Sequence, residues 1–307
     1  MKLFSALVIL TGVMFLASLF VGYAAISIPE GLSALIGRGN PLYVTIMQDI
    51  RLPRALLAAM VGVSLGLAGA AMQGFLRNPL AEPGLIGVSG SAALGAVIAL
   101  QTGLAAAFAL ALPVAALTFA ALAVGLILLL AGPRGSSLTL ILAGIAVSAF
   151  AAALTSLTLN LSPNPYAASE IMFWMMGSVA NRAMSHVWLA LPVMALGWIA
   201  LAGLGRGLDA LTLGEDAAEA LGISLSRLRL QLLFGTAAAV GAATAMAGAV
   251  GFVGLVVPHI LRRFAHGRPS TLLWASALGG AAMVLAADLT TRLVLPDRDL
   301  KLGVVMA

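Results

Sequence analysis

The chain has 307 residues, of which 62% are hydrophobic and 9% are charged, and its mean hydropathy is +1.10. Soluble domains carry about a quarter charged residues, so this composition excludes a soluble protein. The net charge of +5 invites a nucleic-acid-binding interpretation, but the basic residues are dispersed singly among predicted loops, which excludes that class. Cysteine is absent and the three histidines are scattered, so the sequence predicts no disulfide, no metal site and no cofactor.

Long apolar runs divide the whole chain into predicted membrane spans. Only helices and closed barrels satisfy backbone polar groups in lipid, and unbroken runs exclude the ten-residue alternation of barrel strands. The sequence therefore predicts an all-α, polytopic membrane protein in which residues 1–307 form a single transmembrane domain. The predicted spans are residues 1–26, 55–76, 84–100, 105–131, 138–159, 188–204, 230–250, 251–263 and 272–289. Residues 302–307 look like the start of a tenth span, so we expect a ten-span fold whose last span is cut short.

Glycines and prolines predict how these spans pack and where they end. The second span carries Gly62, Gly66, Gly69 and Gly74, which permit close contact between helices. Residues 27–53 are predicted to be a loop, and residues 77–83 (RNPLAEP) a break after the second span. Pro258 is predicted to break the eighth span. A short interfacial helix is expected at residues 168–176.

Two segments of similar sequence indicate an internal repeat. Residues 67–84 read LAGAAMQGFLRNPLAEPG, and residues 246–263 read MAGAVGFVGLVVPHILRR. Both place an AGA step before a glycine and a proline-containing segment. On the predicted topology the second span runs inward and the seventh runs outward. The pattern therefore predicts an inverted repeat, a plan that is common among transporters.

One polar segment, residues 206–229, interrupts the apolar chain. It holds Asp209, Glu215, Asp216 and Glu219, four of the eleven acidic residues, together with Arg206, Arg227 and Arg229. Residues 213–221 predict a short helix that Gly222 ends at the C′ position, and a second helix starts at Ser224 or Ser226. Exposed backbone and charge cannot lie in lipid, so we expect a docking surface on one face of the membrane. An ordinary cytosolic connector is the alternative.

The sidedness of this segment follows mainly from counting spans. With the N-terminus inside, nine basic residues fall on the cytosolic side and seven on the outer side, a small bias under the positive-inside rule.

Ionisable residues are missing from the middles of the second to seventh spans. A proton- or ion-coupled carrier normally needs one there. Asp288, near one end of the ninth span, has Arg292 at i+4, which predicts a local ion pair. Energy for transport is therefore expected to arrive from outside the membrane, at the polar segment. A secondary transporter or channel without an ATPase is the alternative class, and a membrane enzyme lacks any nucleophile–base or metal constellation.

Four segments carry a resemblance to a known family. They are RLPR at 51–54, GAAMQGFLRNPLAEPGLIGVSGSAALGA at 69–96, LAGIAVSA at 142–149 and GAVGFVGLVVPHILRR at 248–263. These segments resemble the FecCD family, the permease subunits of type II ABC importers that move iron–siderophore complexes, haem or cobalamin. The resemblance implies a homodimer with a second permease copy, two cytosolic ATP-binding subunits, a periplasmic binding protein and a place in the bacterial inner membrane.

The resemblance also implies what the chain carries and what it does not do. It implies import of an iron complex, either a siderophore or haem, with vitamin B12 as the alternative cargo. The chain has no GxxxxGK[ST] phosphate loop, so it is not expected to be an enzyme, and a partner subunit would hydrolyse ATP.

Roles for individual residues follow from the same resemblance. The coupling segment, which would lie in a groove of the ATP-binding subunit, is Leu213, Gly214, Glu215, Asp216, Ala217, Ala218, Glu219, Ala220, Leu221, Gly222 and Ile223. Arg51, Arg54 and Arg292 match family positions that meet acidic residues of the binding protein. Exposed arginines pair with carboxylates and steer encounter, but the alternative is that they anchor the protein at lipid headgroups.

A cytosolic gate is implied where the fourth and fifth spans meet. Its residues are Ser136, Ser137, Leu138 and Thr139. A plain helix start with serine as the N-cap is the alternative interpretation of this stretch.

Overall fold

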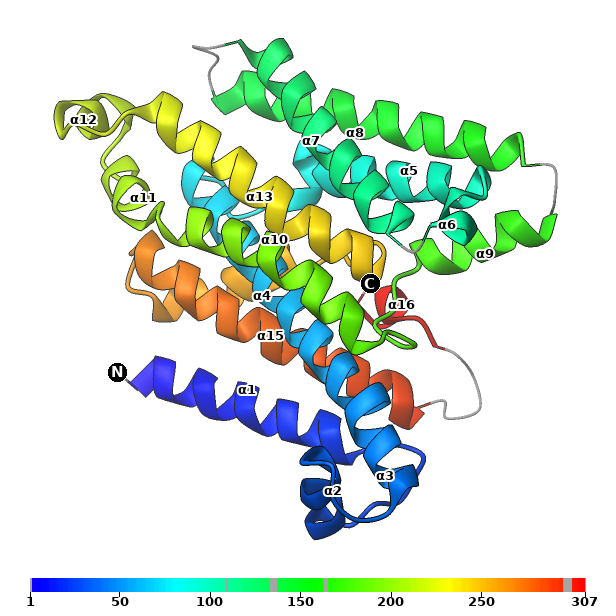
Figure 1. Ribbon diagram of the computed structural model, residues 1–307. Coiled ribbons are helices and arrows are strands. Elements are labelled where there is room, and N and C mark those ends of the chain that lie inside the picture. Colours follow the sequence, from blue (N-terminus) through cyan, green and yellow to red (C-terminus); the bar gives the residue numbers. More distant parts are fainter. Residues whose placement is uncertain (1, 109, 133–136, 163–164, 295–299, 307) are drawn as a thin grey trace.

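The computed structural model describes residues 2–108, 110–132, 137–162, 165–294 and 300–306, and the regular elements in these ranges are all helices (Figure 1). Within these ranges, seven helices are long and apolar enough to cross a membrane. The long helices are α1 (Lys2–Phe20), α4 (Leu52–Phe75), α7 (Ala111–Ala131), α8 (Ser137–Asn160), α10 (Met184–Ala202), α13 (Leu225–Ala247) and α15 (Pro269–Val294). The all-α membrane class is confirmed, and the count of ten spans stays a prediction.

Shorter helices connect these long ones. The α-helical connectors are α2 (Ile28–Leu35), α3 (Pro41–Thr45), α5 (Val88–Gln101), α6 (Leu104–Ala107), α9 (Pro165–Met175), α11 (Gly205–Leu211), α12 (Glu215–Ala220), α14 (Val253–Leu261) and α16 (Leu302–Met306). A π-helical turn, η1 (Ile46–Arg51), and two 3₁₀ turns, η2 (Pro83–Ile86) and η3 (Arg262–Phe264), complete the described elements. The helix expected at residues 168–176 is present as α9, and its interfacial position stays a prediction.

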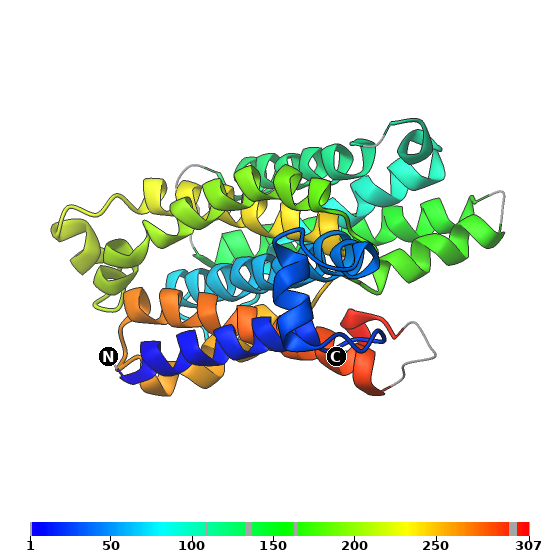
Figure 2. The same ribbon diagram turned by 60° about the horizontal axis from the view of Figure 1, so that its bottom comes forward.

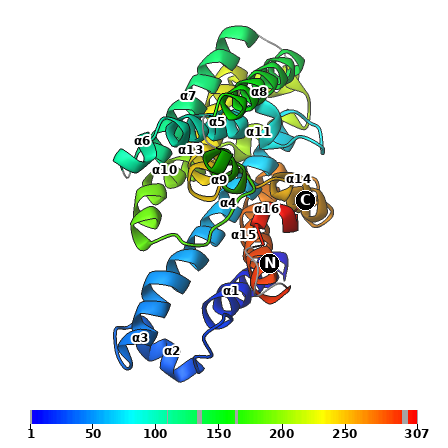
Figure 3. The ribbon, with the colours of Figure 1, turned by 90° about the vertical axis from the view of Figure 1, so that its right-hand side faces the viewer.

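α4 lies in the middle of the bundle. In the continuous helical segment Pro41–Phe75, which ends with α4, 83% of the residues in the most apolar stretch are buried within the protein. In the most apolar stretch of α1, 17% of the residues are buried. α15 runs beside α4, and α1 lies along the far side of α15, as Figure 2 shows. α10 and α13 pack on another side of α4. α5, α7 and α8 form a group beyond α13, on the side of the molecule away from α1 (Figure 3).

Glycines bring α4 into backbone contact with its neighbours. A Cβ atom on Gly62 would overlap the carbonyl of Gly280 in α15, and one on Gly66 would overlap the carbonyl of Ser276. A Cβ on Gly69 would overlap Gly254 of α14. Lipid tails are as apolar as leucine, so helices in membranes associate through close packing of this kind rather than through exclusion from water. The close contact that the sequence predicted for this span is confirmed.

The predicted loop at residues 27–53 is wrong, because this stretch is mostly helical. Ser27 and Glu30 form a capping box at the start of α2, in which the Ser27 hydroxyl accepts from the Glu30 N–H and the Ser27 N–H donates to the Glu30 carboxylate. Asn40 caps α3, and η1 then joins α3 to α4 without a break. The fully buried Met47 and Ala34 hold this part together. The Ser-x-x-Glu pattern was the signal that could have predicted α2.

The predicted break at Pro258 is also wrong, since α14 continues through it. Proline removes the N–H that would bond the carbonyl four residues earlier, here Gly254. The side-chain amide of Gln73 donates to this carbonyl at 3.4 Å and to that of Leu255 at 3.2 Å. The freed carbonyl thus has a donor from α4, and the helix does not need to end.

The two repeated segments meet beside the C-terminal half of α4. The carboxylate of Glu82 accepts from the N–H of Phe252 at 3.0 Å, and Phe252 has a positive φ of 64°. A Cβ on Gly254 would lie 2.7 Å from Cδ of Pro83 and 3.1 Å from the carbonyl oxygen of Leu65. α4 and α13 run in opposite directions, as expected for an inverted repeat (Figure 1).

We predict that Gly66→Ala lowers the stability of the protein. The new methyl group would meet the fixed carbonyl of Ser276, and overpacking of this kind costs about 1–3 kcal/mol. The measurement is thermal unfolding of the detergent-purified protein. Gly125→Ala in α7 is the control, because a Cβ there meets nothing within 4 Å. Equal midpoints for the two variants would contradict the role of close contact.

Candidate functional site

Two glycines shape the coupling segment. Gly214 precedes α12 with φ of 107°, and Gly222 follows it with φ of 83°, both in the region that only glycine adopts without strain. The N–H of Gly222 bonds the Glu219 carbonyl at 2.8 Å, and the N–H of Ile223 bonds that of Ala218 at 3.0 Å. This pair of bonds is a Schellman motif, so the predicted C′ glycine is confirmed. α12 begins two residues later than predicted, and Ser224 caps α13.

The surface of the coupling segment is acidic and apolar. Glu215, Asp216 and Glu219 are exposed. Leu213 and Leu221 are 70% and 64% exposed, on either side of the acidic helix. Ala218 is fully buried and ties α12 to the core, and Ile223 packs against the same core. α12 lies at one end of the molecule, beyond the ends of α10 and α13 (Figure 1). This arrangement suits a groove that offers basic groups and an apolar floor.

Polar contacts join this end of the molecule to α4 and α15. The carboxylate of Asp209, in the unpredicted helix α11, accepts from the N–H of Ser270 at 2.9 Å and from its hydroxyl at 2.6 Å. Asp209 thereby bonds the first turn of α15, where backbone N–H groups lack helical partners. Arg77, which follows α4 with φ of 50°, forms an exposed ion pair with Glu215 at 3.5 Å.

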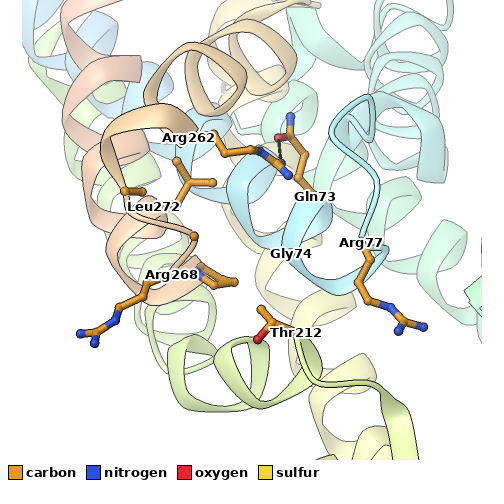
Figure 4. A pocket seen from close by; sticks show the side chains of 10 residues that line it. Gln73, Gly74, Arg77, Thr212, Arg262, Arg268 and Leu272 are labelled. Carbon is orange, nitrogen blue, oxygen red and sulfur yellow. Dashed lines mark hydrogen bonds between the residues drawn. The ribbon is translucent and has the colours of Figure 1, made fainter.

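A cavity of about 270 Å³ lies between these contacts. Figure 4 shows Arg262 bent toward Gln73, to whose side-chain oxygen it donates at 2.7 Å, while Arg77 and Arg268 point away on opposite sides. The walls of this cavity are the end of α4, Thr212 after α11, and the segment that joins η3 to α15. Sequence reasoning assigned no role to Gln73 or Arg262, whose contacts with α14 and with each other only the fold brings together.

The predicted ion pair between Asp288 and Arg292 is confirmed, and it belongs to a larger group. Arg54 of α4 also pairs with Asp288, with 2.8 Å between Nη2 and Oδ1. We call Arg51, Arg54, Asp288 and Arg292 the arginine clasp. The Asp288 side chain is only 2% exposed. A buried carboxylate needs this kind of charged partnership, since its desolvation is costly.

The arginine clasp also satisfies the end of α1. Arg51 donates to the carbonyls of Leu19, Phe20 and Ala24 at 3.0, 3.1 and 2.6 Å. Arg292 donates to those of Ser18 and Val21 at 2.9 and 3.0 Å. The last four carbonyls of a helix have no partner within the helix and carry partial negative charge, so cationic donors stabilise them. The clasp therefore binds α1, α4 and α15 to one another.

The expected exposure of the three arginines is wrong for two of them. Arg51 is 5% exposed and Arg292 is 8% exposed. The N–H groups of Arg51 are directed to carbonyls at the end of α1, and those of Arg292 to such carbonyls and to Asp288, because these acceptors lie beside them inside the protein. Arg54 keeps a 19% exposed side chain.

The predicted gate lies partly outside the described residues. Ser136 falls there, and the side chain of Ser137, at the start of α8, is not among those described. Leu138 is 64% exposed on α8, and Thr139 is partly buried. The gate role stays a prediction.

Comparison with known proteins agrees with this geometry. Residues 9–307 match the FecCD transport family. The ABC transporter permease protein YvrB of Bacillus subtilis (strain 168) is 39% identical over 90% of this chain and 79% of its own length. The vitamin B12 import system permease protein BtuC of Vibrio cholerae is 39% identical over 85% of this chain and 78% of its own length.

A solved structure has the same fold. It is described as an inward-facing conformation of a putative metal-chelate type ABC transporter, and it matches with a TM-score of 0.89 and 31% identity. The match covers 100% of this chain and 94% of that chain.

The chain belongs to the FecCD transport family, whose members are permease subunits of type II ABC importers. It is a multi-pass membrane protein, and its family implies an ATP-binding subunit and a substrate-binding protein as partners.

We predict that Asp288→Asn destabilises the protein far more than Glu215→Gln. Removing the Asp288 charge leaves two guanidinium groups without their buried partner, which costs about 3–5 kcal/mol. The Arg77–Glu215 pair is exposed on both sides and is worth about 0–1 kcal/mol. The measurement is the unfolding midpoint of each variant in detergent, monitored by circular dichroism. Similar unfolding midpoints for both variants would show that the clasp does not hold the fold.

Proposed function

We propose that this chain is the permease subunit of a binding-protein-dependent importer that carries a metal chelate into the cytoplasm. The observation that carries the proposal is the coupling segment, an exposed acidic helix outside the apolar bundle of a FecCD family member. Two copies form the permease in the bacterial inner membrane, and a dimer of separate ATP-binding subunits drives it. The coupling segment lies on the cytosolic side, and the arginine clasp lies at the opposite end.

In this proposal α12 is the contact through which nucleotide-driven movement enters the permease. Glu215, Asp216 and Glu219 meet basic groups of the ATP-binding subunit, while Leu213 and Leu221 fill apolar positions beside them. Movement of α12 acts on α4 through the Arg77–Glu215 pair, and on α15 through α11 and the Asp209–Ser270 bonds. These contacts support coupling because they join the exposed helix to the two most closely packed helices of the bundle.

The cargo we propose first is an iron complex, either a siderophore or haem, as the family resemblance implies. Similarity to a putative metal-chelate type transporter supports a chelated metal in general. Vitamin B12 is the second candidate, and the 39% identity to the vitamin B12 permease of Vibrio cholerae favours it. Binding of a ferric siderophore, haem and cyanocobalamin to the co-purifying binding protein distinguishes them.

We predict that reversing the three acidic residues of the coupling segment abolishes assembly with the ATP-binding subunit. The triple variant Glu215→Lys, Asp216→Lys and Glu219→Lys replaces attraction by repulsion at an exposed surface and leaves the bundle intact. The measurement is recovery of the ATP-binding subunit from native membranes by pull-down and mass spectrometry. The unaltered chain is expected to recover it in near-equal amount.

The matched control for this experiment is Glu30→Lys, which changes an exposed acidic residue of α2. It is expected to recover the ATP-binding subunit as the unaltered chain does. The proposal fails if the triple variant still recovers the ATP-binding subunit fully. It also fails if the unaltered chain is recovered without that subunit under conditions that preserve known complexes.

We propose that the binding protein docks at the clasp end and contacts Arg54, which is the one of the three arginines with a partly exposed side chain, at 19%. We predict that Arg54→Gln lowers the affinity for the binding protein by about tenfold in low salt, chiefly through a slower association rate. Surface plasmon resonance at two salt concentrations measures this. Arg38→Gln, at an exposed position between α2 and α3, is the control. Unchanged affinity with Arg54→Gln would remove Arg54 from the docking site.

A further inference from the structure

A second cavity, of about 310 Å³, lies at the end of the molecule that carries α9. Its walls come from the end of α5, the last turn of α9, the segment between α9 and α10, the end of α13 and the residue before α16. Its polar lining residues are Trp174, Ser178, Asn181, Arg182 and Lys301. None of the described residues that line it is acidic. Small-molecule sites begin at about this volume.

Arg182 is the unusual residue in this cavity. It is partly buried, and it makes no hydrogen bond or ion pair with the residues that the structure describes. Its Nε atom is closed to water and has no acceptor. Burial lowers the pKa of Arg182 from its ordinary value, because the charged form loses hydration. Arginine stays protonated, so a positive charge faces this cavity without a described counter-charge.

Trp174, which also lines the cavity, has a second buried N–H group without an acceptor in the described part of the chain, at its indole Nε1. A buried donor without a partner costs about 1–3 kcal/mol. Two such donors line one cavity, and both are satisfied by the same kind of group, an acceptor with several oxygens. Lys301 also lines the cavity, and its Nζ lies 5.7 Å from the ring centroid of Phe173.

Backbone hydrogen bonds join three of the segments that surround the cavity. The N–H of Ser178 bonds the Ala247 carbonyl at 2.7 Å, which ties the segment after α9 to the end of α13. The N–H groups of Leu302 and Gly303 bond the carbonyls of Gly177 and Met176, each at 2.9 Å. A site whose frame is fixed by contacts between elements is arranged before its ligand arrives, which reduces the cost of binding.

We propose that this cavity is a binding site for an oxyanion, a carboxylate or phosphate group, held by the guanidinium of Arg182 with help from Trp174 and Ser178. Arginine presents paired N–H donors that match the geometry of both groups. The group is carried either by a free small molecule or by the headgroup of an anionic lipid. The site does not depend on the identity of the imported cargo or on the role of the coupling segment.

The test uses the 307-residue chain in phosphatidylcholine nanodiscs, titrated with citrate at constant ionic strength. The readout is the change in tryptophan fluorescence that disappears in Trp174→Phe. We expect a saturable change, with the affinity weakened at least about tenfold in Arg182→Ala. Arg182→Lys keeps the charge and loses the paired donors, so it is expected to bind with intermediate affinity. Arg38→Ala, an exposed arginine outside the cavity, is expected to behave as the unaltered chain does.

A second arm distinguishes the two sources of the anion. Replacing phosphatidylcholine by phosphatidylglycerol is expected to shift the Trp174 signal without citrate, and to weaken citrate binding, if the headgroup enters the cavity. An unchanged titration in phosphatidylglycerol assigns the site to free anions. The proposal is overturned if neither citrate nor phosphatidylglycerol changes the Trp174 signal, or if Arg182→Ala or, should that variant fail to fold, Arg182→Lys responds as the unaltered chain does.

Discussion

The backbone contact between α4 and its neighbours is the constraint on which the rest of the structure depends. Gly62 and Gly66 allow α15 to lie directly against α4, and Gly69 does the same for α14. In lipid this close packing replaces the hydrophobic effect as the force between helices. Polar contacts then fix both ends of the packed helices. The arginine clasp joins α4 to α15 and α1 at one end, and Gln73 joins α4 to α14 and Arg262 at the other. The bundle therefore has a tightly held centre, with the more exposed helices α7, α8 and α10 around it.

The coupling segment contacts this tightly packed centre of the bundle. α12 is short, is bounded by glycines with positive φ, and has one fully buried side chain, Ala218. It reaches the bundle through Arg77 after α4 and through Asp209 at the first turn of α15. In the proposed function, force from the ATP-binding subunit enters at this short exposed helix and arrives at α4 and α15, which cannot separate without breaking their backbone packing. Displacement of the bundle as a unit, rather than local unfolding, is the expected response.

The sequence predicted the parts of this account that depend on local pattern. Long apolar runs located the seven long helices, Gly222 predicted the end of α12, and the i,i+4 spacing predicted the Asp288–Arg292 pair. The failures have physical causes. Pro258 does not end α14 because Gln73, 185 positions away along the chain, supplies the missing donor. Arg51 and Arg292 are buried because the free carbonyls at the end of α1 lie beside them, a proximity that no local pattern contains. Arg182 and Trp174 were likewise unremarkable until the fold placed them on one cavity.

The central claim is that transport through this chain is driven from outside the membrane. It rests on apolar spans without ionisable residues in their middles and on an exposed coupling segment. The most direct test is uptake of the labelled cargo into proteoliposomes that contain the chain with its ATP-binding subunit, in the presence of the loaded binding protein. The account predicts accumulation only when hydrolysable ATP is present on the side of the coupling segment, and none with a non-hydrolysable analogue. Accumulation driven by a proton or sodium gradient without the ATP-binding subunit would contradict it.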